Sequence, residues 1–154
     1  MDGIDYHFTS HAKMEELIAA GKFLEHANVH GNIYGTSFEA IQHVENQLRK
    51  ICLLDIDVQG VRSMKLHERE EGTPKLKGNY IFISPPSLET LKTRLMGRGT
   101  ETFESLERRT KNAQMEMEYG LENGNFDYII VNDDLEEACK NFDRIVKEIY
   151  GNIC

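Results

Sequence analysis

The sequence lacks an apolar run approaching the roughly 20 residues that a membrane-spanning helix needs, so we expect no membrane partner. The first residues, MDGIDYHF, contain neither a basic region nor an apolar block, and we therefore expect no signal peptide. The three cysteines are scattered and odd in number, which argues against a disulfide framework and for a reducing compartment. Together these absences favour a cytoplasmic protein, with an organelle reached by a lost leader as the alternative.

Basic residues are also too few for a nucleic-acid-binding surface, because the net charge is −8. We therefore expect no nucleic-acid polymer as a partner. The 154 residues, 40% of them hydrophobic, suit one domain with its own core. An acidic protein can still bind phosphate through a local group of arginines, and one such group is Arg94, Arg98, Arg108 and Arg109.

Short apolar runs alternate with helical stretches from Ile51 onwards, which predicts an α/β fold. The runs are ICLLDI, YIFIS and YIIV, and their weak alternation is typical of parallel strands buried on both faces. The predicted helices are Val58–His67, a long stretch Ser87–Glu122 broken near GRGTE, and Asp134–Tyr150.

The N-terminal third has a different pattern, which predicts a small α+β lobe. Ser10 can cap a helix that continues to Ala20. Gly31 and Asn32 form a tight-turn signal between two strand candidates. The expected strands are Tyr6–Phe8, Phe23–Val29 and Asn32–Tyr34, and the next helix is expected from Thr36 to about Leu48.

Asp55 and Asp57 follow the first apolar run in the stretch DIDVQG. A calcium loop is excluded, because its twelfth position would be Leu66 instead of a bidentate glutamate. One interpretation places both acids at the carboxyl end of a parallel strand, where ligands bind in open α/β sheets. The other makes Asp57 the N-terminal cap of the helix that begins at Val58. Both interpretations remain open.

Two further groups of side chains each have a functional and a structural interpretation. The arginines in and around GRGTETFESLERR can form a lid over phosphates, or a solvated face neutralised by nearby glutamates. In the small lobe, Glu25 can accept from the two-donor edge of guanine with Thr36 beside it, while Tyr6 and Tyr34 bond phosphate; ordinary strand surface is the alternative.

Together these pieces resemble guanylate kinase. The resemblance covers nearly the whole chain and rests on GIDYHF, FLEHANVHGNIYGTS, LLDIDVQGV, IFISPPSLETLKTRLMGRGTETFESLERR and IIVNDDL. It implies a P-loop kinase that transfers a phosphoryl group from ATP to GMP with Mg²⁺. It also implies a parallel-sheet core, a GMP-binding lobe at about residues 3–35 and a helical lid around residues 96–112, with residues 36–154 as core and lid together.

The resemblance assigns roles to individual residues by motif. Tyr6, Glu25, Tyr34, Gly35 and Thr36 would hold GMP, with Glu25 on the guanine base. Asp57 would approach the same base, and Asp55 the phosphate side and, through water, Mg²⁺. Arg94, Arg98 and Arg109 would be lid arginines on the phosphates. Asn132 would contact the adenine of ATP.

Two parts of the family pattern are missing, namely the phosphate-binding loop GxxxxGK[ST] and a TTR-type segment that carries phosphate-binding arginines. The resemblance therefore implies an N-terminally truncated family member that lacks this loop and the first strand of the core. We expect the kinase activity of this polypeptide to be low or nil. The alternative is a catalytically inactive guanylate-kinase-like domain that binds phosphopeptides.

Overall fold

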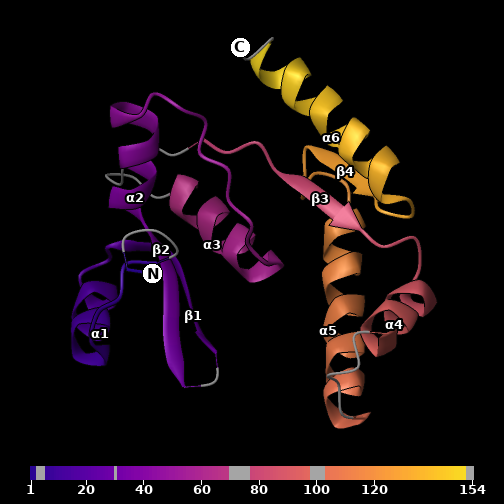
Figure 1. The fold of residues 1–154 in the computed structure, drawn as a ribbon, viewed down its shortest axis with the longest axis horizontal. Helices are drawn as coiled ribbons and strands as arrows, with labels where there is room; N and C mark the ends of the chain where they lie inside the picture. The colour runs from indigo at the N-terminus through magenta and orange to yellow at the C-terminus, as the bar shows by residue number, and fades with distance from the viewer. Residues whose placement is uncertain (3–5, 30, 70–76, 98–102, 152–154) are drawn as a thin grey trace. The chain divides into compact units, whose positions relative to one another are not determined.

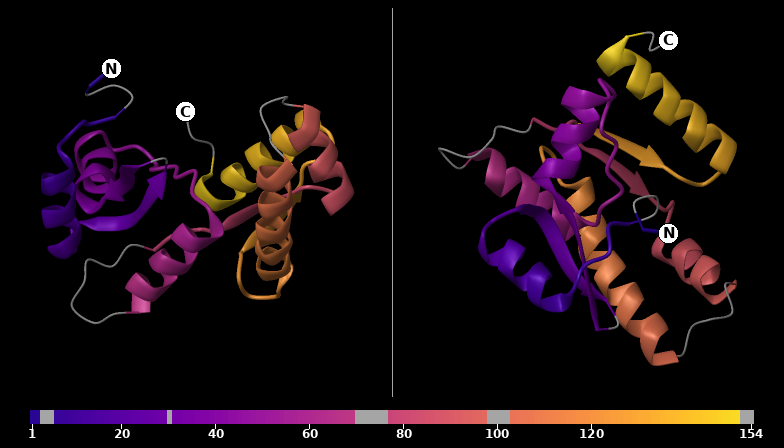
Figure 2. Two further views of the ribbon diagram at one scale, coloured as in Figure 1. Left: turned by 90° about the horizontal axis from the view of Figure 1, so that it is seen from below. Right: turned by 60° about the vertical axis from the view of Figure 1, so that its left-hand side comes forward.

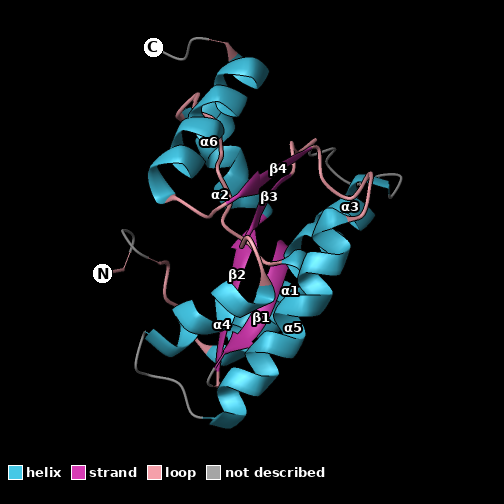
Figure 3. Ribbon diagram, turned by 90° about the vertical axis from the view of Figure 1, so that its right-hand side faces the viewer, coloured by secondary structure: helices cyan, strands magenta, loops and turns pink. Residues whose placement is uncertain are grey.

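A computed structural model describes residues 1–2, 6–29, 31–69, 77–97 and 103–151. The chain forms two compact units, Met1–Lys77 and Gly78–Cys154. Among the described residues, the strands form two two-stranded sheets, β1 with β2 and β3 with β4 (Figure 3). The first pair is antiparallel and the second is parallel. The chain therefore combines helices and strands as expected for the α/β class, although with small sheets.

The N-terminal unit is built around the β1–β2 hairpin. Its elements in chain order are α1 (His11–Ala19), β1 (Phe23–Val29), β2 (Asn32–Ser37), α2 (Phe38–Gln42), the π-helix η1 (His43–Gln47) and α3 (Val58–Arg69). α1 lies against both strands, and α3 packs against β1 (Figure 1). The turn after β1 is tied to α1, because His11 Nε2 lies 2.9 Å from the carbonyl oxygen of Gly31.

Buried apolar side chains in this unit come from its helices and from the first strand. Leu24 on β1 and Ile41 on α2 are 5% and 4% exposed. On α3 the buried residues recur at helical spacing, at Val58, Val61 and Met64, so that one face of the helix is covered. This packing fixes the hairpin that carries four of the candidate site residues, Glu25, Tyr34, Gly35 and Thr36.

The C-terminal unit contains the parallel pair β3 (Ile81–Ser84) and β4 (Tyr128–Val131). Its helices are α4 (Leu88–Gly97), α5 (Phe103–Leu121) and α6 (Leu135–Tyr150). α6 covers the strands with a core of Ile130, Ala138 and Ile145 (Figure 2). Phe82 turns toward α5, where Gly120 leaves room for its ring, since a Cβ on Gly120 would overlap it. The crossover between parallel strands thus passes through two helices.

Most predicted elements are confirmed. Ser10 caps α1 by accepting a hydrogen bond from Lys13 N at 3.3 Å. β3 and β4 are parallel as expected, and the helical stretch between them is divided into α4 and α5. α6 begins after Asp134, whose side chain accepts from Glu137 N at 3.0 Å.

Three predictions about the secondary structure are wrong, namely two expected strands and one helix start. Residues 51–56, expected as a core strand, have no regular secondary structure, since within the described residues they join neither sheet. Thr36 belongs to β2 instead of the following helix, which is capped by Ser37 and begins at Phe38. In the segment Tyr6–Phe8, Tyr6 forms an isolated bridge with Asp2, and no strand develops.

Candidate functional site

Glu25 and Thr36 form a polar pair across the β1–β2 hairpin. Their Cα atoms are partners in the ladder, and Thr36 Oγ1 donates a hydrogen bond of 2.6 Å to Glu25 Oε1. Both residues are half-buried. A hydrogen bond to a carboxylate is stronger than one between neutral groups, so this contact orients the glutamate on its strand.

A β-bulge sets this pairing. The register shifts between Phe23 and Glu25, which leaves Leu24 as the extra residue of β1. Bulges occur next to functional sites, where they redirect a side chain. Because of the bulge, Phe23 and Glu25 lie on opposite faces: Phe23 pairs with Ser37, whereas Glu25 pairs with Thr36. The buried Leu24 anchors the bulge in the unit's interior.

Two tyrosines lie on the same side of the hairpin as this pair. Tyr34 is two residues before Thr36 on β2, so both side chains point to one face. The Tyr6 ring meets the Tyr34 ring edge-on, with 5.6 Å between ring centroids. Tyr6 and Tyr34 are 55% and 40% exposed, so both side chains are accessible to solvent. The structure thus brings together four of the residues predicted for one site.

Gly35 has a packing role in the hairpin. A Cβ atom at this position would lie 2.6 Å from the carbonyl oxygen of Glu25 and 2.9 Å from Cδ1 of Phe23. Phe23 therefore covers Gly35 on the face opposite the Glu25–Thr36 pair. The role expected for Gly35, a close approach of its backbone to a nucleotide, stays a prediction.

Asp57 caps α3. Its Oδ1 accepts a hydrogen bond of 2.8 Å from the backbone N–H of Gly60, the donor two residues into the helix. The cap interpretation of Asp57 is therefore confirmed, while the ligand interpretation stays a prediction for its second carboxylate oxygen. Asp55 is exposed in the irregular segment that precedes α3. The strand expected to carry both acids is absent, but they still precede the helix that packs on β1.

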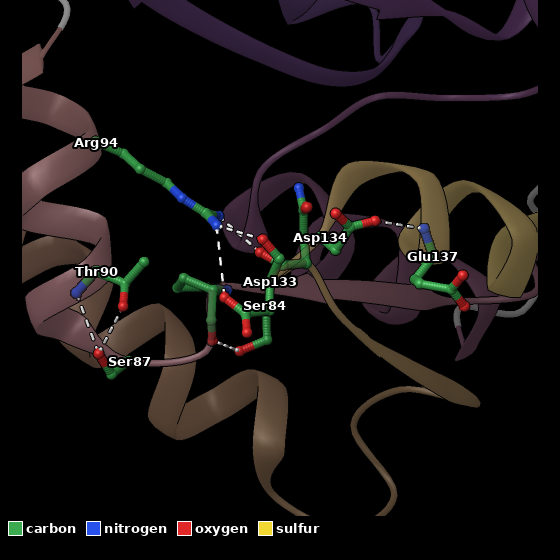
Figure 4. A network of polar contacts seen from close by, with 9 residues as sticks. Ser84, Ser87, Thr90, Arg94, Asp133, Asp134 and Glu137 are labelled. Carbon is green, nitrogen blue, oxygen red and sulfur yellow. Dashed lines mark hydrogen bonds and ion pairs between the residues drawn. The ribbon is translucent and has the colours of Figure 1, made fainter.

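The second group of predicted residues lies in the C-terminal unit, at the carboxyl ends of β3 and β4. Arg94 extends from α4 to the turn between β4 and α6 (Figure 4). Its Nη1 donates to the carbonyl oxygen of Asn132 at 2.6 Å, and its Nη2 to that of Asp133 at 2.8 Å. Arg94 and Asn132 are thus neighbours, as their shared assignment to ATP requires.

Of the other two predicted arginines, only Arg109 lies within the described residues. Arg109 is exposed and is the seventh residue of α5. Arg98 lies outside the described residues. The lid of which both would be part stays a prediction, as does the division of the chain into lobe, core and lid.

Two contributors to these groups were missed by sequence reasoning. Leu24 sets the bulge, and a bulge has no local sequence signal beyond two successive apolar residues. Asp133 contributes a carbonyl to Arg94 from 39 positions away, and its Oδ1 lies 3.9 Å from Arg94 Nη2. No spacing rule connects residues at that separation.

Within the described part of the chain, His, Cys, Asp and Glu side chains do not gather in groups of three or more that could hold a metal ion. The described helices include none with the length and apolar character needed to cross a bilayer.

Comparisons with known proteins agree with one another. The sequence model of the family described as guanylate kinase matches residues 1–149. The chain is 46% identical to guanylate kinase 1 of Oryza sativa over 146 residues, which cover 95% of this chain and 36% of that protein. It is 44% identical to human guanylate kinase over 147 residues, 96% of this chain and 71% of that protein.

The fold has a similar counterpart among solved structures. The crystal structure of guanylate kinase from Anaplasma phagocytophilum matches with a TM-score of 0.64 and 30% identity, covering 97% of this chain and 67% of that one. The chain thus spans about a third of the length of the rice relative and about two thirds of the length of the bacterial one.

Proposed function

The chain belongs to the guanylate kinase family, and we propose that its hairpin binds GMP as the acceptor of a phosphoryl group from ATP. The observation that carries this proposal is the hydrogen bond of 2.6 Å between Thr36 Oγ1 and Glu25 Oε1. It holds a half-buried carboxylate beside a hydroxyl on the face that also carries Tyr6 and Tyr34.

Guanine is the purine base whose edge fits this pair. Its N1–H and N2–H₂ groups are two adjacent donors, and an ionised glutamate is an acceptor with two oxygens. Thr36 can turn its hydroxyl from Glu25 to the neighbouring carbonyl of the base. Asp57, with Oδ1 on the backbone of α3, has Oδ2 for the base amino group. Adenine offers no such pair of donors on that edge, so the arrangement favours GMP over AMP.

The tyrosines provide the phosphate end of the same site. Their hydroxyl groups can donate to the phosphate oxygens of GMP, and the ring contact between Tyr6 and Tyr34 limits how far either side chain can turn away. Because one end of the hairpin reads the base and the tyrosines hold the phosphate, the acceptor oxygen is oriented. Orientation of this kind, together with electrostatic stabilisation, accounts for most of the catalysis in phosphoryl transfer.

ATP is assigned to residues of the C-terminal unit. Asn132 contacts adenine, and Arg98 and Arg109 approach the phosphates as lid arginines. In the family reaction a phosphate oxygen of GMP attacks the γ-phosphorus in line, the bond from the γ-phosphorus to ADP breaks, and GDP and ADP are the products, while guanidinium groups stabilise the negative charge on the transferring group. Because the sequence lacks GxxxxGK[ST], we expect this step to be slow or absent in this polypeptide. Closure of the lid excludes water and so prevents hydrolysis of ATP. We place this reaction in the cytoplasm, as the scattered cysteines favour.

Mg²⁺ fits this chain as an ion carried by the nucleotide. It keeps several waters and usually binds phosphates together with one or two carboxylates. Asp55 is an exposed carboxylate that can accept from such a water. When bound, the ion supplies neutralisation of phosphate charge.

The test is the substitution Glu25→Gln, which replaces one acceptor oxygen by a donor amide. We expect GMP to bind about 30-fold more weakly by isothermal titration calorimetry, the equivalent of about 2 kcal/mol for a charged hydrogen bond. ATP affinity should not change. Glu39→Gln, at an exposed glutamate of α2 in the same unit, is the matched control.

Inosine monophosphate, which lacks the N2 amino group, sharpens this experiment. The unmodified chain should bind it more weakly than GMP, and Glu25→Gln should reduce the difference, with Asp57 Oδ2 still available to the amino group of GMP. Equal GMP affinity in the Glu25→Gln variant and the unmodified chain would overturn the assignment. Tight binding of a phosphoserine peptide without any GMP binding would instead support the alternative of an interaction domain.

A further inference from the structure

Arg94 makes an unusual pair of contacts for a residue expected on phosphate. Two nitrogens of its guanidinium donate to the carbonyl oxygens of two successive residues, Asn132 and Asp133, at 2.6 and 2.8 Å. The carboxylate of Asp133 is near as well, with Oδ1 3.9 Å from Nη2. Figure 4 shows the side chain pointing from α4 straight at this turn.

The same turn is held from the other side by β3. Asn132 N donates to the carbonyl oxygen of Ser84 at 2.7 Å, and Ser84 is 2% exposed at the end of its strand. The next residue, Asp134, caps α6 through Glu137 N. The backbone of Asn132 and Asp133 is therefore fixed by a strand, by a helix start and, from α4, by Arg94.

We propose that Arg94 is a positioning residue, which fixes the Asn132–Asp133 turn so that Asn132 presents its side chain to the base of ATP. This inference rests on the ATP site proposed above and changes the role of Arg94 within it. The planar fork of guanidinium places two separate nitrogens on two neighbouring carbonyls, a fixed geometry that the single nitrogen of a lysine ammonium does not reproduce. Arg94 thus acts through Asn132, and Arg98 and Arg109 remain as the arginines for phosphate.

The two roles differ in how binding depends on the number of phosphates. Substitution of a positioning residue lowers the affinity for every ligand that carries the adenine base, by the same factor. Substitution of an arginine that binds phosphate lowers the affinity for ATP strongly, for ADP less and for adenosine not at all. The roles also differ for lysine, which keeps a charge for phosphate but loses the two-carbonyl contact.

The experiment compares Arg94→Gln and Arg94→Lys with the unmodified chain, titrated with adenosine, ADP and ATP and followed by NMR chemical shifts. We expect each ligand to bind about tenfold more weakly to Arg94→Gln, by the loss of two charge-assisted hydrogen bonds. Arg94→Lys should restore little of this loss. A loss that grows from adenosine to ATP, or full rescue by lysine, would overturn the proposal.

A control and a second readout separate this role from a general loss of stability. Arg144→Gln removes an exposed arginine on α6 of the same unit, whose Nη1 lies 3.6 Å from Glu148 Oε2, and should leave all three affinities unchanged. Amide hydrogen exchange should accelerate at Asn132 in Arg94→Gln, while the amide of Ile145, in the middle of α6, keeps its protection.

The exchange measurement also distinguishes failure of this inference from failure of the proposed function. If the unmodified chain binds no adenine nucleotide, the ATP site is wrong, and exchange at Asn132 alone then decides whether Arg94 fixes the turn. Unchanged exchange at Asn132 in Arg94→Gln would overturn the positioning role, whatever the nucleotide titrations show.

Discussion

At the scale of single residues, Glu25 shows what a sequence can and cannot predict. Its residue type and its place in the small lobe were enough to suggest recognition of guanine. Its contact with Thr36 at 2.6 Å was not predictable as a ladder pair, because the bulge at Leu24 changes which residues face each other. The polar segment Gly35–Ser37 also does not have a strand-like composition, yet it completes β2. Side-chain chemistry is local, whereas cross-strand register depends on the partner.

Cys52 gives a prediction at the same scale. Desolvation by burial, and to a smaller extent the negative charge of Glu45, raises the pKa of the Cys52 thiol. The thiolate is the reactive form, so less of Cys52 is reactive at a given pH. Cys139, in contrast, is exposed on α6.

We expect iodoacetamide at pH 8 to alkylate Cys139 well before Cys52. The rates can be followed by mass spectrometry of peptides, in a Cys154→Ser background because Cys154 lies outside the described residues. Unfolding in urea is the control and should remove most of the difference. Equal rates in the folded chain would show that the Cys52 thiol is not shielded.

At the scale of elements, helices were predicted better than strands. α1 and α6 begin after Ser10 and Asp134, and both caps can be read locally because a capping side chain bonds to a backbone N–H three residues ahead. Residues 51–56 have strand-like composition but lack a ladder partner among the described residues, and a strand exists by virtue of its partner. Composition alone cannot supply that information.

The cap of α6 leads to a stability prediction. Asp134→Ala removes the acceptor for Glu137 N and a negative charge near the positive end of the helix dipole, so unfolding should become easier by about 1 kcal/mol. Urea unfolding followed by circular dichroism measures this. Asp134→Asn should retain most of the stability, because asparagine also caps.

The matched control is Asp143→Ala, at an exposed aspartate of the same helix that lies beyond its first turns. It changes the charge equally but leaves the cap intact, and its effect should be within about 0.5 kcal/mol of zero. A loss for Asp143→Ala as large as that for Asp134→Ala would attribute the effect to net charge instead of capping.

At the scale of the whole molecule, each unit buries its own apolar side chains. Leu24, Ile41 and Val61 are buried in the N-terminal unit, and Ile130 and Ile145 in the C-terminal one. The α/β class followed from alternating helices and apolar runs. The division at Lys77 and Gly78 did not, because a unit boundary depends on where contacts concentrate and not on local sequence.

Substitutions at two glycines, one in each unit, test whether the packing of one unit affects the stability contributed by the other. Gly35→Ala places a Cβ against the Glu25 carbonyl and the Phe23 ring, and Gly120→Ala places one 2.4 Å from atoms of the Phe82 ring. Each should lower the free energy of unfolding by about 1–3 kcal/mol, the usual effect of overpacking. Since the two sites share no neighbours, the double variant should lose the sum to within about 0.5 kcal/mol.

Urea unfolding of the single and double variants measures these losses. Gly124→Ala is a useful reference, because Gly124 has a positive φ of 89° with nothing within 4 Å of an added Cβ. Its effect therefore reports backbone strain without overpacking. A double variant whose loss departs from the sum by more than about 1 kcal/mol would show that the two sites are coupled.

The bulge at Leu24 has a consequence for how this hairpin can change. The extra residue supplies a buried side chain, whereas Glu25 and Thr36 supply the recognition chemistry, and the two tasks fall on different positions of one strand. Removing Leu24 would restore regular alternation and still leave Glu25 opposite Thr36. Selection, natural or in the laboratory, can therefore change the stability of the lobe through Leu24 and its specificity for the base through Glu25.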